Sequence, residues 1–561
     1  MKKLFALVLA LCMLIPSVSY AAAKSDEYDA WIQKLVDEFT AHVDGTQDEE
    51  KMAPYDEPIT LTSWTRYNSA LDNMMPDLFE DYGETYDDNR WTDVFKSLFN
   101  IDVEYLWHSL DSDYTQQVRL AMAAGELPDF FVVTEQSDIM ELAEAGVIMN
   151  LDDMIDQYAS SWNIEYWNED GGRSLEMASY QGDVYGLTVM GACTDELSWL
   201  WMRQDWLDEL GLSEPTTIDE LRACIDAFCA ADFDGNGVND TVGMAIDSGL
   251  WYSTRGLFSG FSAYPQYWVE KDGNLEWGGV SEENRAALQF LADLYAEGKM
   301  DVEWVVSSKN RFQSVVDGKC GAFYGGFWEA SQCEDCCDLD PDARWVSVEL
   351  PSQTGDPVMS PVRVHNYGWI CINANCEHPE AVFKLAAATI YSYVNAELAP
   401  FYAESGSAGG SIGWLSPIYT GMYPFITIDA ANEIAYAYET GDDSHLTAFG
   451  KMYYDLYQEE RQNDSGMYYD LMFGPNDYSA WWELKRIADE GRFFYDGFYG
   501  ANSEFMNERW SSILSEQLIA YTKIITGEVG VDEGFDAWLA SFDSLGGGQI
   551  TEEVNEWYHN H

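Results

Sequence analysis

Basic side chains are scarce in this 561-residue chain: 29 Lys and Arg stand against 98 Asp and Glu, which gives a formal net charge of −69. A surface of that sign repels phosphate backbones and anionic lipid headgroups, so nucleic-acid binding and membrane-surface binding are excluded as functions. Only seven His are present, and no H-E-x-x-H, P-loop or G-x-G-x-x-G motif occurs. The sequence therefore carries no signature of a zinc protease, a P-loop nucleotidase or a dinucleotide-binding enzyme.

Long apolar runs are absent after the N-terminus, so no membrane-spanning helix of about 18 residues is predicted. Residues 1–23 have two lysines, an apolar run and small residues at their end, which is the pattern of a secretory signal peptide. The stretch "LALC" suggests a lipoprotein acceptor at Cys12, but Leu11 is bulky and the apolar run continues past it. Cleavage near Ala21 to Ala23 is favoured, and the sequence predicts a secreted or cell-envelope protein.

Nine cysteines remain after such cleavage. Export permits disulfides, but an odd number leaves at least one thiol free or paired between molecules. "CEDCC" (333–337) invites a zinc site, yet a closed tetrahedral site needs four ligands and no nearby His completes it. A local disulfide or free thiols are the favoured alternatives. The nine are Cys193, Cys224, Cys229, Cys320, Cys333, Cys336, Cys337, Cys371 and Cys376.

Hydrophobic residues make up 47% of the chain and aromatic residues 15%, which excludes a disordered protein. Residues 24–57 read as an amphipathic helix followed by an acidic linker. From residue 59 strands alternate with helices of ten residues or more, which predicts parallel sheets covered by helices on both faces. The chain from 429 onward is mostly helical in its pattern. The predicted strands are "ITLTSW", "IDVEYLW", "PDFFVV", "DVYGLTV", "ELSWLWM", "TVGMAI" and "GKCGAFYGG".

Six phrases, spread in order from about residue 58 to 558, carry a family resemblance. They are "GELPDFFVV", "DVYGLTV", "LWMRQDWLDELGLSEPTTIDEL", "DGKCGAFYGGFWEA", "YGWICINANCEHPEAVFKL" and "GGGQITEEVNEWY". The chain resembles the family 1 extracellular solute-binding proteins, the sugar-capturing components of ABC importers. Within that family it is most similar to the longer oligosaccharide-binding members, some of which contain a calcium ion.

The resemblance implies a periplasmic-binding-protein-like α/β fold of type II topology, in which two lobes joined by a hinge enclose a ligand cleft. It places lobe 1 at 58–190 plus 360–428 and lobe 2 at 191–359 plus 429–561. The chain would cross between the lobes at 185–189 and 368–373. The implied partners are an oligosaccharide and the permease subunits of an ABC transporter, and the protein is expected to be a monomer.

The loop "DFDGNGVNDTVG" (232–243) is a candidate calcium site. It follows a helix that begins with a capping box of Thr217 and Glu220. Its oxygen-bearing residues alternate as in an EF-hand loop, with Gly237 at the sharp turn. The predicted ligands are Asp232, Asp234, Asn236, the Val238 carbonyl, Asp240 and Thr241.

The loop departs from an EF-hand at its end, because Gly243 stands where a bidentate Glu is expected. Calcium-binding members of the resembled family have an acidic residue directly after the ninth position, where this chain has Thr241, and this loss of charge weakens the site. A metal-free DG/NG-rich turn is the alternative. The spacing, the ligand type and the place in the family together favour a structural Ca²⁺ ion.

Trp and Tyr are abundant, with 22 and 35 copies. A sugar ring stacks its C–H face on a flat aromatic ring and offers its hydroxyls to fixed donors and acceptors. Any one of these aromatics can instead belong to the core, and Arg203 can be a structural ion-pair residue. The candidates near the ends of predicted strands or on cleft loops implied by the resemblance are Trp328, Phe327, Trp64, Tyr67, Thr134, Glu135, Tyr367, Trp369, Asn366, Arg203, Trp251, Trp304 and Trp414.

A secreted, calcium-stabilised glycoside hydrolase is the alternative function. Its chemistry needs two carboxylates about 5 to 9.5 Å apart, and 98 acidic residues supply such pairs by chance. "GGSIG" matches a nucleophile elbow at Ser411, but it lacks the strand before and the helix after. A surface adhesin would show repeats or an anchoring motif, and neither is present. The sequence therefore favours a binding protein without enzymatic activity.

Overall fold

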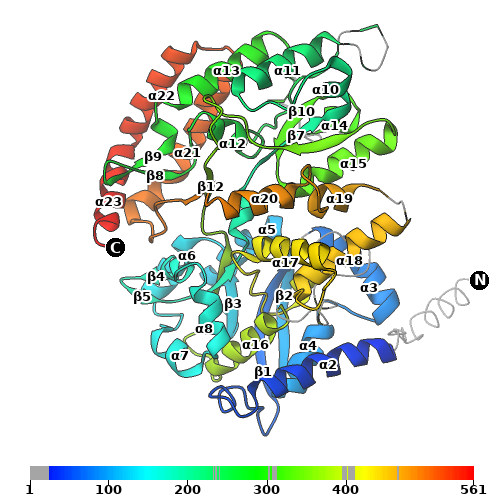
Figure 1. Ribbon diagram of the computed structural model, residues 1–561. Helices are drawn as coiled ribbons and strands as arrows, with labels where there is room; N and C mark the ends of the chain where they lie inside the picture. The colour runs from blue at the N-terminus through cyan, green and yellow to red at the C-terminus, as the bar shows by residue number, and fades with distance from the viewer. Residues whose placement is uncertain are drawn as a thin grey trace, which may run out of the picture.

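A computed structural model describes residues 24–561 except 68, 232, 234–236, 239, 301–303, 306–311, 394–397, 399–400, 402–410 and 464–465. The predicted signal peptide and Cys12 lie outside the described residues. The chain forms two α/β lobes, one above the other in Figure 1. Lobe 1 here denotes the elements from α2 to β6 with β13 and α16, and lobe 2 those from β7 to β11 with α17–α23. The residue bounds of the lobes given above stay a prediction.

Lobe 1 contains a parallel pair of strands beside a three-stranded sheet of order β3-β13-β6. The two are joined where the Ser63 hydroxyl donates to the Phe130 carbonyl at 3.0 Å. β13 is antiparallel to β3 and β6, so the prediction of wholly parallel sheets is wrong: β13 enters the lobe from the opposite direction. The strands are β1 (Ile59–Tyr67), β2 (Ile101–Leu110), β3 (Phe130–Val133), β4 (Ser179–Tyr180), β5 (Asp183–Val184), β6 (Leu187–Met190) and β13 (Asn366–Ile372).

Helices cover both sides of these strands (Figure 1). They bury apolar side chains against the sheet, and α16 is buried along almost its whole length. They are α2 (Asp26–Val43), α3 (Ser69–Tyr82), α4 (Arg90–Phe99), α5 (Asp111–Ala124), α6 (Gln136–Glu144), α7 (Asp152–Tyr158), α8 (Ser161–Asn168), α9 (Arg173–Glu176) and α16 (Pro379–Tyr391).

Lobe 2 has a three-stranded sheet in which β7 lies between β10 and β11 and is antiparallel to both, again against the parallel prediction. The predicted strand "TVGMAI" (241–246) forms only isolated bridges, at Val242, Met244 and Ala245. The capping box of Thr217 and Glu220 at the start of α11 is confirmed. The strands are β7 (Trp199–Arg203), β8 (Trp268–Lys271), β9 (Asn274–Trp277), β10 (Ala322–Gly325) and β11 (Trp345–Val348).

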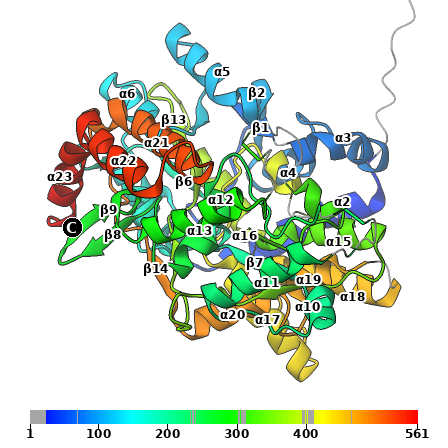
Figure 2. The ribbon, with the colours of Figure 1, turned by 90° about the horizontal axis from the view of Figure 1, so that it is seen from above.

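The last three helices of lobe 2 lie far from α18 and α19. Seen from above in Figure 2, α21–α23 lie on one side of the molecule and α18 and α19 on the other. The predicted helical C-terminal part is confirmed. The helices are α10 (Gln204–Leu210), α11 (Ile218–Ala230), α12 (Trp251–Gly260), α13 (Asn284–Ala296), α14 (Gln313–Val316), α15 (Ala330–Leu339), α17 (Ile426–Thr440), α18 (Ala448–Asn463), α19 (Tyr468–Phe473), α20 (Ala480–Asp489), α21 (Glu504–Ile525), α22 (Val531–Leu545) and α23 (Gly547–Tyr558).

Three segments that connect the lobes run side by side. The Gly191 N–H donates to the His365 carbonyl at 2.8 Å, and the Cys193 N–H donates to the Pro424 carbonyl at 2.8 Å. The segment after β6 therefore lies between the other two. A short parallel pair, β12 (Ser360–Val362) and β14 (Phe493–Tyr495), flanks this bundle. The stretches expected to cross, 185–189 and 368–373, contribute to strands of lobe 1, and the crossings lie just beyond these strands.

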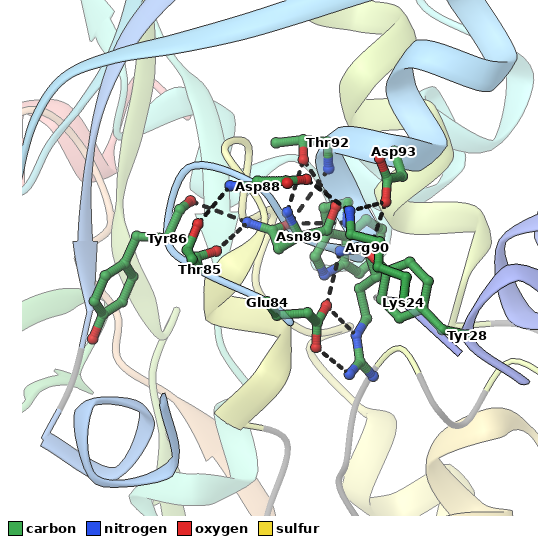
Figure 3. Close-up of polar contacts among 11 residues, drawn as sticks. Lys24, Tyr28, Glu84, Thr85, Tyr86, Asp88, Asn89, Arg90, Thr92 and Asp93 are labelled. Carbon is green, nitrogen blue, oxygen red and sulfur yellow. Dashed lines mark hydrogen bonds and ion pairs between the residues drawn. The ribbon is translucent and has the colours of Figure 1, made fainter. Parts of the chain in front are cut away.

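The N-terminal helix α2 packs into the core of lobe 1, where Tyr28, Leu35 and Phe39 are among its buried residues. Its start is tied to α4 by polar contacts (Figure 3). The Lys24 ammonium donates to Asp88 at 2.7 Å and to Asp93 at 2.5 Å. The Tyr28 hydroxyl donates to Asp93 at 2.8 Å. Asp93, in the first turn of α4, thus ties this turn to the start of α2.

A buried ion pair lies next to these contacts (Figure 3). The Arg90 guanidinium donates to Glu84 through Nε at 2.8 Å and Nη2 at 2.5 Å, and the Arg90 backbone N–H adds a third bond at 2.9 Å. The two side chains are 1% and 0% exposed. The guanidinium also lies over the rings of Trp31 and Tyr82, at 5.2 and 5.5 Å from their centroids. The pair therefore connects α2, α3 and α4.

All nine cysteines of the described chain are free thiols, and eight of them are buried. Of the two alternatives left open for "CEDCC", free thiols is the one observed. Burial raises the pKa of the Cys337 thiol to about 12, which keeps it protonated and unreactive near neutral pH. Among the described residues, no helix combines the length and the apolar character that crossing a membrane requires.

Candidate binding site between the lobes

The edge of lobe 1 that faces lobe 2 is set by where the chain leaves β6. Asn366 is opposite Met190, the last residue of β6, and Trp369 is opposite Val133, the last residue of β3. Thr134 and Glu135, which follow β3, therefore lie at the edge from which the chain crosses. The Thr134 hydroxyl is hydrogen-bonded to Thr115 at 3.0 Å. Glu135 is exposed.

Lobe 2 presents Trp328 at its matching edge. β10 ends at Gly325, opposite Trp199, which is the first residue of β7 after the crossing. Trp328 follows within three residues and is partly exposed. Its ring stacks on Tyr252, from the first turn of α12, with centroids 5.8 Å apart and planes 24° apart. A flat aromatic surface thus lies at the end of the lobe 2 sheet that faces lobe 1.

An aromatic group on lobe 1 surrounds Trp414. Trp414 stacks on Tyr419 with centroids 4.3 Å apart, and Tyr367 meets it edge-on at 5.7 Å. The Arg66 guanidinium lies 5.3 Å from the Trp414 ring and donates to the Tyr367 carbonyl. Arg66 therefore fixes the end of β1 against the start of β13 and places a cation beside the rings.

A second aromatic group extends this surface. Tyr67, at the end of β1, stacks on Tyr86 with centroids 4.5 Å apart, and His108 from β2 lies 5.1 Å from the Tyr86 ring. The Tyr86 hydroxyl donates to Asp72 at 3.0 Å. Rings of this kind combine a flat apolar face with polar edges, which is the chemistry that a saccharide requires.

A cavity of about 340 Å³ lies between the lobes. Lobe 1 contributes Glu135 and Gln136, and the crossing segment contributes Arg363. The Gln136 carboxamide oxygen accepts a hydrogen bond from the Asn502 N–H of lobe 2 at 3.1 Å. Aromatic rings from lobe 2 form much of the remaining wall: Trp268, Trp277, Phe498, Tyr499 and Trp510.

The sequence model of the bacterial extracellular solute-binding proteins matches residues 79–388, which is more than half of the chain. The chain belongs to this family. The predicted family resemblance is therefore confirmed, and membership favours a binding protein over the hydrolase alternative.

Two curated relatives are similar to this solute-binding protein. Lipoprotein LipO of Bacillus subtilis (strain 168) is 29% identical over 243 residues, 41% of this chain and 45% of that protein. The fructooligosaccharide ABC transporter substrate-binding protein FusA of Streptococcus pneumoniae serotype 4 (strain ATCC BAA-334 / TIGR4) is 26% identical over 210 residues, 35% of this chain and 39% of that protein. The matched segments thus span less than half the length of these relatives.

Solved structures confirm the two-lobed fold of this solute-binding protein. An HMO-binding, ABC-transporter-associated solute-binding protein from Bifidobacterium longum infantis ATCC 15697 aligns with a TM-score of 0.62 and 16% identity, over 90% of this chain and 99% of that one. An EF-hand mutant of FusA in complex with fructo-nystose aligns with a TM-score of 0.57 and 16% identity, over the same shares of the two chains.

Four of the predicted ligand residues of this solute-binding protein are core residues. Trp64 stacks on Trp107 at 4.8 Å, and the Trp369 indole N–H donates to the Ser174 carbonyl at 3.4 Å. None of the four is more than 8% exposed, so their rings offer no face to a ligand, and we leave them out of the proposed site. They are Trp64 and Trp369 in lobe 1 and Trp304 and Phe327 in lobe 2.

Arg203 and Trp251 also have structural contacts. Arg203 ends β7 on the side away from Trp199, is 2% exposed and pairs with Asp205 at 2.6 Å. Because β7 begins at Trp199 next to the crossing segments, Arg203 at its other end lies away from them. The Trp251 ring packs against Tyr521 in the interior of lobe 2, with centroids 5.4 Å apart. Arg203 is therefore a structural ion-pair residue, which was the alternative to its role as a ligand residue. We leave both Arg203 and Trp251 out of the proposed site.

The structure adds residues that the sequence did not single out, above all Tyr252, Arg66, Tyr86 and Tyr419. Each is placed by a ring or cation contact with a predicted residue rather than by a motif. The sequence could have pointed to Tyr252, since it directly follows the predicted residue Trp251 at the start of a helix. The places of the other three residues depend on which segments of the chain become neighbours in the fold.

The calcium loop is described only in part: Asp232, Asp234 and Asn236 lie outside the described residues. Gly237 has φ +76°, the left-handed conformation that the sharp turn requires. Asp240 pairs with Lys319 at 2.5 Å, and the Thr241 hydroxyl donates to the Ala231 carbonyl at 3.2 Å. In the described part of the chain no group of three or more His, Cys, Asp and Glu side chains is arranged to hold a metal ion.

Proposed function

We propose that this protein is the substrate-binding component of an ABC importer and captures an oligosaccharide between its lobes. The observation that carries the proposal is the pair of aromatic surfaces on the facing edges, Trp328 with Tyr252 on lobe 2 and Trp414 with Tyr367 on lobe 1. The name of the relative FusA, a fructooligosaccharide-binding component, supports the same class of ligand.

The proposed ligand residues fall into rings and polar groups. The rings stack on sugar faces, while the polar groups at the strand ends accept and donate hydrogen bonds to hydroxyls. The proposed set is Trp328, Tyr252, Trp414, Tyr367, Tyr67, Thr134, Glu135 and Asn366. Arg66 positions the rings of Trp414 and Tyr367.

Binding is coupled to closure through the three crossing segments. A ligand that contacts one lobe first gains its remaining contacts only when the second lobe approaches, so its differential affinity for the closed form drives closure. No covalent step is required. A net charge of −69 disfavours a strongly anionic ligand, so the proposed ligand is a neutral or weakly charged oligosaccharide.

The ligand can be identified by a thermal-shift screen of the mature protein against neutral and uronic-acid oligosaccharides of increasing length. We expect one class of short oligosaccharide to raise the melting temperature in a saturable way, because it binds the folded state alone. Monosaccharides should have a smaller effect, since they cannot reach the rings of both lobes. A panel in which no saccharide shifts the melting temperature would contradict the proposed ligand class.

Export and delivery are parts of the same proposal. The predicted signal peptide would direct the chain across the membrane, and a monomeric receptor in the cell envelope or outside the cell would then hand its ligand to permease subunits. The relative LipO is named a lipoprotein, which keeps a lipid anchor at Cys12 as the alternative form of attachment.

We further propose that the loop at 232–241 holds one structural Ca²⁺ ion. The donors in its sequence are carboxylates, an amide and a carbonyl, which are the hard oxygen ligands that calcium prefers. Asp232, Asp234, Asn236, Val238 and Asp240 would hold the ion, with Thr241 as the weakest member. The left-handed Gly237 fits the loop, and the solved EF-hand mutant of FusA places an EF-hand in a protein of similar fold.

Calcium removal should lower stability. With calcium at about 100 times its Kd, binding to the folded state alone contributes about 2.7 kcal/mol, and EGTA should remove this contribution and lower the melting temperature. The Asp234→Asn variant should be insensitive to EGTA. Lys319→Gln should bind calcium more tightly than the wild type, because the Lys319 ammonium pairs with Asp240 and so competes with the ion for this carboxylate. Equal melting temperatures with calcium and with EGTA would favour the metal-free turn.

A further inference from the structure

A second cavity, larger than the one described above, has no part in the proposed oligosaccharide site. Its volume is about 740 Å³, and it is bounded by α2, α8 and the end of α16 in lobe 1 and by α17 in lobe 2. Tyr423, on the crossing segment that precedes α17, lines this cavity. Arg363, on the crossing segment that precedes β13, lines the cavity described above. Because the segment after β6 lies between these two, the cavities flank the crossing bundle on opposite sides.

Aromatic rings form one part of the wall. His42 lies 5.0 Å from the ring of Trp162 and 5.0 Å from that of Tyr391, so three rings from α2, α8 and α16 meet at one point. Tyr393 and Tyr423 lie 6.2 Å apart and continue the wall toward lobe 2. The rings provide apolar surface and electron-rich faces, which attract cations.

Carboxylates form the other part, and they come from both lobes. Glu165 projects from α8, and Asp429 and Glu433 project from α17. Glu433 accepts hydrogen bonds from the Thr447 N–H and hydroxyl at 2.8 and 2.9 Å. No Lys or Arg is among the residues that line this cavity.

The charges of these groups are poorly compensated. Burial raises the pKa of Asp429, and burial together with the nearby charge of Asp429 raises that of Glu433 despite its bonds to Thr447. Glu169, at the end of α8, has its pKa raised to about 7 by burial, then by the charge of Asp429 on α17 and by that of Glu165 on α8 itself. A cation in the cavity would relieve this repulsion.

We propose that this cavity is a second binding site, which takes an aliphatic polyamine. The protonated amines would pair with Glu165, Asp429 and Glu433, and the methylene chain between them would pack on the rings of Trp162, Tyr391 and Tyr423. A cavity of this size lies within the usual range for small-molecule sites. Because both lobes supply carboxylates, the ligand bridges them on the flank of the hinge that bears Tyr423.

The test is calorimetric titration of the mature protein with spermidine in about 0.15 M salt, where weak surface attraction is screened. Glu165→Gln/Asp429→Asn removes two carboxylates of the cavity. Glu508→Gln/Glu528→Gln removes the same charge from exposed positions on and after α21 and is the matched control. We expect one molecule of spermidine per chain, affinity at least tenfold weaker in the cavity variant, and affinity within twofold of the wild type in the control.

A third variant, Tyr423→Leu, separates an organic cation from a metal ion. Spermidine binding should weaken several-fold in this variant, while any Mg²⁺ binding at equal ionic strength should not change. Equal affinity for spermidine in the cavity and control variants would show counterion attraction by the whole surface and overturn the proposal. Spermidine affinity that is unaffected by Tyr423→Leu would overturn the assignment of the aromatic wall.

Discussion

Trp328→Ala is expected to weaken oligosaccharide binding at least tenfold, which corresponds to about 1.4 kcal/mol or more. The partly exposed ring stands at the edge of lobe 2 that faces lobe 1, and Tyr252 holds it flat by stacking at 5.8 Å. Its loss removes a stacking surface that is preorganised, so the ligand loses contact area without any compensating relaxation. Trp328→Phe should lose less, because a smaller ring still stacks.

The matched control is Tyr436→Ala, which truncates an aromatic that is 43% exposed on α17. Its affinity for the same oligosaccharide should equal that of the wild type. Isothermal titration of the three variants decides the matter. An unchanged affinity for Trp328→Ala would remove this residue from the site, and an equal loss in Tyr436→Ala would show a general effect on the fold.

Glu84→Gln is expected to destabilise the protein by about 3 to 5 kcal/mol, the usual cost of leaving one member of a buried ion pair without its partner. Arg90 and Glu84 are almost completely buried, and Glu84 accepts two bonds from the guanidinium and one from the Arg90 N–H. The neutral amide cannot compensate the cation. Because Arg90 on α4 also lies over Trp31 of α2 and Tyr82 of α3, the loss should appear in urea unfolding of lobe 1.

Two further variants separate charge from packing. Glu84→Leu/Arg90→Met removes both charges and should be less destabilised than Glu84→Gln, since no unpaired charge remains buried. Lys96→Gln breaks the exposed pair between Lys96 and Asp102 and should change the free energy of unfolding by less than about 1 kcal/mol. A loss below 1 kcal/mol for Glu84→Gln would show that Arg90 finds water or another partner, against the contacts described.

Local signals in the sequence predicted local structure well. The capping box of Thr217 and Glu220 begins a helix as expected, because the interaction depends on residues three apart. The direction of β13 could not be predicted in this way. It depends on the chain returning from lobe 2, a relation between segments that lie more than a hundred residues apart, and this return makes both pairings of β13 antiparallel.

The candidate site shows the same division. Trp64 and Trp328 both follow or end a predicted strand beside small residues, yet Trp64 is 1% exposed against Trp107 and Phe131 whereas Trp328 is partly exposed. Which face of a strand becomes covered is decided by the neighbouring helix and not by the residues around the ring. The buried pair of Arg90 and Glu84 gave no sequence signal for the same reason.

The central claim is stoichiometric capture of an oligosaccharide without chemical change. The most direct test is isothermal titration of the mature protein with the best oligosaccharide from the screen, followed by chromatography of the recovered sugar after overnight incubation. We predict one molecule bound per chain at micromolar affinity or tighter, about −8 kcal/mol or below, and a sugar of unchanged length. Shortening of a molar excess of the sugar by a small amount of the protein would contradict the account and establish the hydrolase instead.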